Sequence, residues 1–200
     1  MEENKNKVVE LLKQYMSTPE DEPSRGLSYL KEAVFILNGQ GKTLAAHEIL
    51  EKELRKFEDN STVEMAILLN MMIKLSTLVG DFASAIEHSK RAQVICTEKN
   101  ERELLTKVII NTSGLYFKMK DYDKALMCAN KALQMAKKNG DEINAACCLN
   151  NIAIIHENGE TGESGIPFLE EAVKIKEKHS MNTELPSSYM NLAELYYDSE

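Results

Sequence analysis

Four histidines and four cysteines are the residues of this 200-residue chain best suited to metal binding or nucleophilic catalysis. The histidines never stand four residues apart, the spacing that lets two imidazoles on one helix face share a metal ion. His156 falls among apolar and aromatic positions, so we expect a buried, hydrogen-bonded core histidine. The sequence therefore predicts no metal site.

Cys147 and Cys148 are adjacent and would suit a redox or soft-metal pair. On a helix, however, neighbouring side chains point about 100° apart, and no basic residue beside these two would activate a thiolate. Phosphate-binding and nucleophile-elbow motifs are also absent. We predict reduced structural thiols, no cofactor and no enzyme activity within this chain.

Charge and composition narrow the class of protein further. The 24 basic and 32 acidic residues give a net charge of −8, which disfavours nucleic acid as a partner. Apolar runs are far shorter than the roughly 18 residues of a membrane span, and the N-terminus has no signal-peptide pattern. Only 9 Gly, 4 Pro and no Trp occur, so we expect an all-helical protein of the cytoplasm without a membrane partner.

A repeat organises the chain, because a shift of 40 residues aligns much of the sequence with itself. Three rows of small or amide residues coincide at this shift: Ala85, Ala125 and Gly165; Ala92, Ala132 and Ala172; Asn111, Asn151 and Asn191. Small residues suit the places where paired helices cross closely. The third row is expected to make structural hydrogen bonds in the seam between helices.

Apolar residues recur at three- and four-residue steps within each unit, which indicates amphipathic helices in pairs. We predict a leading helix and linker in residues 1–24, followed by a repeat array in 25–200 with units at about 25–60, 61–100, 101–140 and 141–180. The predicted helices cover 5–17, 25–38, 42–58, 62–79, 82–99, 102–119, 122–138, 142–158, 164–179 and a final unpaired helix at 184–198.

Helix ends carry recognisable signals. Ser61 and Glu64 have capping-box spacing, and Gly140 followed by Asp141 would end one helix and cap the next. The first pair matches the repeat least well, because Ala46 takes the crossing position while Glu53 stands where alanine is expected.

The segments GDFASAIEHSKRA (80–92) and KDYDKALMCANKA (120–132) resemble the second helix of the tetratricopeptide repeat (TPR) family. LNNIAIIHENGE and MNLAELYYDSE resemble the first helix of the next unit. The 40-residue period is similar to the longer-repeat subgroup found in bacterial signalling and adaptor proteins. The resemblance implies an all-α, TPR-like α-solenoid of antiparallel helix pairs with a concave groove.

In the TPR family, peptide ligands contact recurring positions of the first helices. Mapped here, the candidate peptide-binding residues are Asn70, Lys74, Lys107, Ile110, Phe117, Lys118, Asn150, Ile154, Glu157 and Met190. The resemblance implies that Asn70 and Asn150 grip the backbone of a bound segment, with Ile110 and Phe117 as apolar anchors. The alternative is that both asparagines are solvated surface residues.

The implied function is a non-catalytic scaffold that binds a protein or peptide segment, either an extended chain or an amphipathic helix. The carboxylate-clamp pattern of chaperone-associated TPR proteins is absent. Two alternatives stay open. One is the sensor or regulatory module of a longer bacterial signalling protein, such as a histidine kinase, a diguanylate cyclase or a peptide-responsive regulator. The other is a homo-oligomerisation array that uses the last helix.

Overall fold

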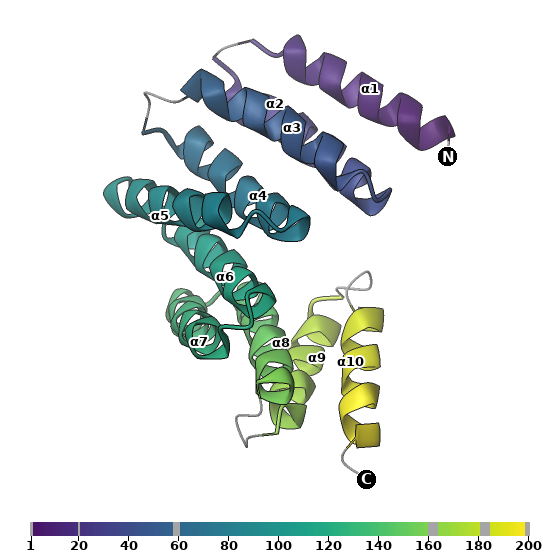
Figure 1. Ribbon diagram of the computed structural model, residues 1–200, viewed down its shortest axis with the longest axis vertical. Coiled ribbons are helices and arrows are strands. Elements are labelled where there is room, and N and C mark those ends of the chain that lie inside the picture. The colour runs from purple at the N-terminus through teal and green to yellow at the C-terminus, as the bar shows by residue number, and fades with distance from the viewer. Residues whose placement is uncertain (1, 20, 58–60, 160–163, 181–184, 199–200) are drawn as a thin grey trace. The chain divides into compact units, whose positions relative to one another are not determined.

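The computed structural model describes residues 2–19, 21–57, 61–159, 164–180 and 185–198, and the regular elements in these ranges are all helices (Figure 1). The all-α prediction is confirmed. The α-helices are α1 (Glu2–Met16), α2 (Pro23–Gly39), α3 (Thr43–Leu54), α4 (Val63–Val79), α5 (Phe82–Glu98), α6 (Arg102–Lys118), α7 (Tyr122–Asn139), α8 (Glu142–Asn158), α9 (Ile166–Lys178) and α10 (Leu185–Asp198), and a short 3₁₀ helix, η1 (Arg55–Phe57), follows α3.

The chain forms two compact units, Met1–Ile95 and Cys96–Glu200, which divide within α5. In the first unit α1 packs on α2 and α3 packs on α4. In the second unit α6, α7, α8, α9 and α10 each pack against the next, and α6 also contacts α8. The first helices α2, α4, α6 and α8 begin at residues 23, 63, 102 and 142, as the 40-residue repeat predicts.

Several predicted helix starts differ from the structure: α1 begins at Glu2 rather than at residue 5, α2 begins at Pro23 rather than at residue 25, and α4 and α9 differ as follows. The cap of α4 is Thr62, whose side chain accepts the amide of Met65 at 3.2 Å, and not Ser61. Helix α9 begins at Ile166, two residues later than predicted, with Pro167 in its first turn, where the missing amide proton costs nothing. The predicted cap of α8 is confirmed, because Asp141 accepts the amide of Asn144 at 3.0 Å.

Small residues lie at the helix crossings, as the aligned positions of the repeat predict. Ala125 is fully buried beside Ile152 and Ile155 of α8, and its carbonyl oxygen accepts a hydrogen bond from Ser113 Oγ at 2.8 Å. At the equivalent repeat position, Gly165 directly precedes α9, and a Cβ added to it would lie 2.6 Å from a backbone oxygen of α8. No side chain therefore fits at Gly165 without moving a helix.

The structure of the first unit shows why glutamate can stand at a repeat position where alanine is expected. Glu53 occupies the position expected for alanine and is buried, with 8% of its surface exposed. The hydroxyl of Tyr15 donates a hydrogen bond to this carboxylate at 2.5 Å, and Lys56 forms an ion pair with it at 2.6 Å. These partners offset the cost of burying the charge and connect α1 to α3.

We expect Ala125→Phe to destabilise the protein by about 1–3 kcal/mol, because it overpacks the crossing of α7 with its neighbours. Asn130→Phe, at an exposed position of the same helix, is the matched control and should cost much less. Urea unfolding followed by circular dichroism measures both. Equal destabilisation by the two variants would contradict the assigned helix register.

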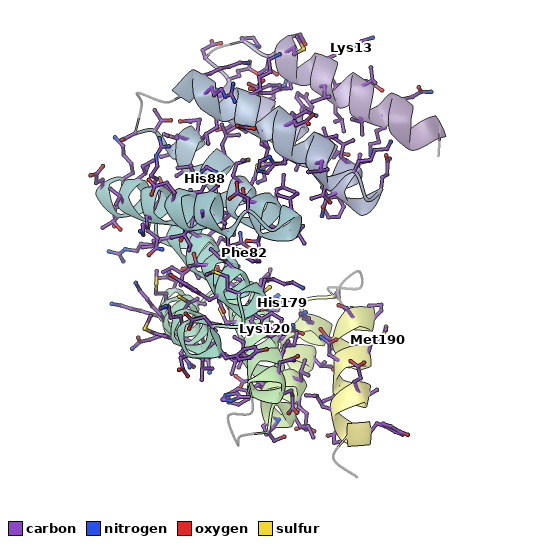
Figure 2. The ribbon with its side chains drawn as sticks, in the orientation of Figure 1. Lys13, Phe82, His88, Lys120, His179 and Met190 are labelled. Atoms are coloured by element: carbon purple, nitrogen blue, oxygen red, sulfur yellow. The ribbon has the colours of Figure 1, made fainter. Side chains whose placement is uncertain are left out.

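His88 on α5 (Figure 2) makes stability depend on pH. Its Nδ1 is buried without a hydrogen-bond partner among the described residues. Burial, and then the charges of Arg91 and His47, lower the pKa of His88 below its ordinary value of 6.5. His88 therefore binds a proton more readily in the unfolded chain than in the folded one. The contribution of neutral His88 to the free energy of unfolding is complete above pH 6.5 and falls as the pH drops below it.

We expect His88→Gln to flatten the loss of unfolding free energy between about pH 7.5 and about pH 5.5, because the titrating group is gone. The parent protein, titrated over the same pH range, is the reference. Urea titrations across this range test the effect. A His88→Gln slope equal to that of the parent would refute it.

Candidate functional site

The first-helix face of the second unit contains a small cavity of about 80 Å³ between α6 and α8. Gly114 and Phe117 line it from α6, and Ile154 lines it from α8. A Cβ added to Gly114 would meet no atom within 4 Å, so the space above this glycine is open. The structure thus brings together two of the predicted contact residues, Phe117 and Ile154, around a gap left by Gly114.

Phe117 serves the core as well as the cavity. Its ring packs against the buried cluster that contains Ala125 and Ile152, and it meets the ring of Tyr122 edge to face, with centroids 5.9 Å apart. These contacts fix the orientation of the ring, which is half-buried. The ring of Phe117 is therefore a rigid wall of the cavity, and a side chain that binds there would not lose affinity by restricting its motion.

Asn151 on α8 also lines the cavity and is half-buried. Within the described residues its amide forms no hydrogen bond, so the structural bond that we expected for this row is not made at Asn151. An amide can both donate and accept, as a peptide backbone requires. The expectation for this row therefore fails at Asn151, which borders the cavity instead.

Asn150 is engaged by the last helix instead. Its Oδ1 accepts a hydrogen bond from Ser188 of α10 at 3.5 Å, and Ser188 accepts one from Lys176 Nζ of α9 at 2.9 Å. Lys176 is buried, with 4% of its surface exposed, although its repeat position 40 residues earlier is Ala136. The sequence signal for this connection was a lysine at a repeat position where small residues stand in the two preceding units, and our prediction of the site overlooked it.

The remaining predicted residues of the second unit are dispersed over its first helices. Lys107 pairs with Glu103 at 2.5 Å, and Lys118 is exposed. Ile110 packs beside the buried cluster of Ile109, Ala132 and Cys148. Two others lie further along the unit: the carboxylate of Glu157 accepts the amide of Gly165 at 2.7 Å, and Met190 on α10 is 72% exposed (Figure 2).

In the first unit, α4 carries the other two predicted residues. Asn70 is half-buried and Lys74 is exposed. They stand one helical turn apart on the same helix, so they can share one face.

The residues that first suggested metal or redox chemistry are structural where the structure describes them. His156 is buried and stacks on Phe168, with ring centroids 5.3 Å apart. Cys148 is buried and Cys147 half-buried, and neither forms a disulfide. No group of three potential metal ligands occurs among the described residues.

This helical architecture defines a TPR-like repeat protein. BtubC from P. vanneervenii matches with a TM-score of 0.73 at 13% identity, covering 98% of this chain and 84% of that one. A Signal Transduction ATPase with Numerous Domains (STAND) protein with a tetratricopeptide repeat sensor, from Pyrococcus horikoshii, matches with a TM-score of 0.71 at 20% identity over 94% of this chain. Aspartyl phosphate phosphatase F from Bacillus subtilis matches with a TM-score of 0.69 at 18% identity over 95% of this chain.

The chain belongs to the RNPP family, whose C-terminal domain profile matches residues 4–143. No curated protein sequence gives a significant match. The chain spans 28% of the length of the STAND protein and 55% of that of the phosphatase. The family indicates a scaffold or regulatory module that binds proteins or peptides. No described helix combines the length and apolar character that a membrane span requires.

We expect Cys148 to resist alkylation by iodoacetamide at about pH 8 in the folded protein, because burial raises the pKa of its thiol to about 12. The same residue should react readily in urea. Mass spectrometry of the digested protein measures labelling at each cysteine, and the intact mass reports any disulfide. Equal labelling rates with and without urea would contradict this assignment.

Proposed function

We propose that the second unit binds an extended peptide segment along the face formed by α6 and α8. The observation that carries the proposal is the cavity above Gly114, which Phe117 and Ile154 border. Its volume of about 80 Å³ equals that of two to three water molecules in the liquid, at about 30 Å³ each, and suits one aliphatic side chain. A peptide would place that side chain in the cavity as its anchor.

The amide of Asn151 would hold the backbone of the same segment. It borders the cavity, so one peptide unit could reach it while the neighbouring side chain enters the gap. A hydrogen bond of this kind contributes about 0.5–1.5 kcal/mol, less than the burial of an aliphatic side chain. Affinity would therefore depend mainly on the anchor, and the amide would favour an extended backbone.

The other predicted contacts extend this face. Exposed Lys118 follows Phe117 directly and would attract an acidic residue of the peptide, whereas Lys107 already pairs with Glu103. Ile110 lies two turns before Phe117 on α6 and would meet the next apolar residue of the segment. Asn150, Glu157 and Met190 remain candidate contacts toward α10, and Asn70 and Lys74 candidate contacts in the first unit.

A second candidate role is that of a sensor module within a longer signalling protein. It is supported by the match to an RNPP C-terminal domain and by the sensor that the STAND protein carries on the same fold. In that role the bound peptide would be the signal. The peptide site proposed above would be unchanged.

We expect Gly114→Leu to weaken peptide binding by about tenfold or more, because the new side chain fills the cavity that the anchor needs. Stability should stay equal or rise, since glycine in a helix costs about 0.8–1 kcal/mol relative to alanine and leucine ranks close to alanine. The measurement is fluorescence anisotropy with peptides selected by the parent protein from a random-peptide library, together with urea unfolding.

Gly39→Leu is the matched control. A Cβ added to Gly39 would also meet no atom within 4 Å, but this residue lies in α2 of the first unit. It should leave the affinity of the selected peptides unchanged. If Gly114→Leu folds normally and binds every selected peptide as tightly as the parent does, the α6–α8 cavity is not the peptide site.

A further inference from the structure

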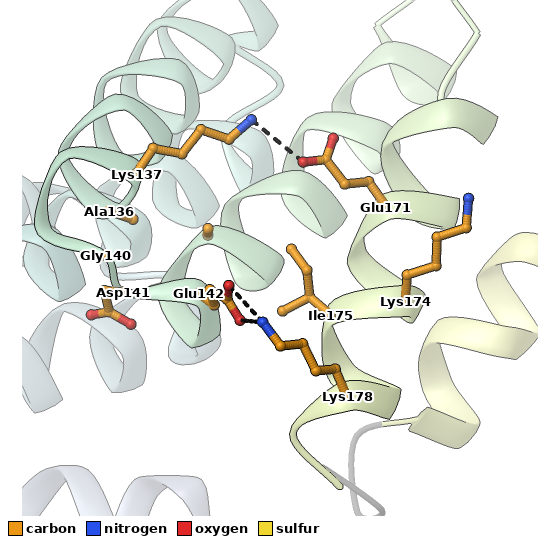
Figure 3. Close-up of a pocket in the computed structure, with 10 residues that line it drawn as sticks. Ala136, Lys137, Gly140, Asp141, Glu142, Glu171, Lys174, Ile175 and Lys178 are labelled. Atoms are coloured by element: carbon orange, nitrogen blue, oxygen red, sulfur yellow. Dashed lines mark hydrogen bonds and ion pairs between the residues drawn. The ribbon is translucent and has the colours of Figure 1, made fainter.

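A larger pocket of about 480 Å³ lies elsewhere in the second unit, between the end of α7, the start of α8 and the second half of α9 (Figure 3). Its apolar floor consists of Ala136, Ala145 and Ile175. Ala136 and Ala145 are almost fully buried, and Ile175 is half-buried against the cluster of Ala146, Leu149 and Ala172. The pocket is distinct in its residues from the α6–α8 cavity.

The repeat itself explains why this pocket is open. Forty residues earlier, Leu105 stands at the position of Ala145, and Met135 stands at the position of Ile175. Leu105 and Met135 both pack against one buried cluster there. In the later repeat the leucine is reduced to alanine, so the space that a side chain of this protein fills in one repeat is vacant in the next.

Charged side chains border the pocket in a defined pattern. Lys137 pairs with Glu171 at 3.4 Å, and Lys178 pairs with Glu142 at 2.7 Å. Lys174 stands between Glu171 and Lys178 along α9, and Figure 3 draws no ion pair from it to the other lining residues. Among the described residues nothing forms a hydrogen bond or ion pair with it.

The two paired carboxylates are not available to a cationic ligand. Hydrogen bonds from Lys178 and His179 lower the pKa of Glu142, which keeps this carboxylate ionised and engaged. The third acidic residue of the lining, Asp141, accepts the amide of Asn144 and also its side-chain amide at 2.5 Å. The ammonium group of Lys174 is therefore the charged group of the rim that no described residue pairs with.

We propose that this pocket is a second docking site, which takes a large aliphatic side chain of a partner protein flanked by an acidic residue. The aliphatic side chain lies on Ala136, Ala145 and Ile175, in the place that Leu105 fills one repeat earlier. The acidic residue pairs with Lys174. Because no residue is shared with the α6–α8 cavity, both sites can be occupied independently.

The test uses the full chain and an array of synthetic peptides on a Gly-Ser background, each displaying one apolar residue beside an acidic, neutral or basic one. The parent protein should select leucine, isoleucine or methionine beside aspartate or glutamate. Ala145→Leu should weaken these peptides by about tenfold or more, because the new side chain takes the place beside Ala136 and Ile175 where the aliphatic side chain would lie. Leu105 shows that the repeat accepts leucine at this position, so the variant should fold.

Ala145→Ser is the matched control, since it keeps the pocket open and should retain binding. Lys174→Glu changes an exposed residue and should shift the selection from acidic to basic neighbours. Gly114→Leu should leave these peptides unaffected. Failure to select aliphatic–acidic pairs, or selected peptides that Ala145→Leu binds unchanged, would overturn this proposal, and loss in Gly114→Leu alone would assign the same peptides to the α6–α8 cavity.

Discussion

The close crossing of paired helices is the constraint on which the rest of the structure depends. At Gly165 an added Cβ would lie 2.6 Å from the carbonyl oxygen of Ala153, and at Ala125 a methyl group fills the crossing completely. Since the backbones meet at contact distance, the larger side chains around them must pack in one register. That register sets α6 beside α8, and only then can Phe117 and Ile154 border one cavity.

Both pockets of the second unit arise where the repeat places a residue smaller than its counterpart. Gly114 has no side chain where Ile154 follows 40 residues later, and Ala145 replaces Leu105. A helical array repeats its backbone spacing from unit to unit, so each missing side chain leaves space at a known place. In such an array, a substitution toward a smaller residue removes core volume locally and creates a surface that can receive a partner's side chain.

Much of the fold could be predicted because the same pattern of small and apolar residues recurs in successive repeats. Coincident rows of alanine fixed the helix pairs, and Gly140 with Asp141 marked a helix junction that the structure has. The turns were less predictable: Asn100 and Lys120 have positive φ angles of 57° and 60°, where glycine is the usual residue. Asparagine tolerates this left-handed conformation, so residue 100 carries a sign of the turn, whereas lysine at residue 120 carries none.

The candidate site was predicted less well, because it depends on helix rotation. Asn150 and Asn151 are neighbours, yet their side chains diverge by about 100°, so one cannot substitute for the other in a groove. The buried ammonium group of Lys176 binds Ser188, and Ser188 in turn binds Asn150, which leaves Asn151 beside the cavity. This partition follows from contacts between α8, α9 and α10 that lie 38 and 12 residues apart along the chain. The last helix thereby engages the amide of Asn150, whereas the amide of Asn151 borders the cavity.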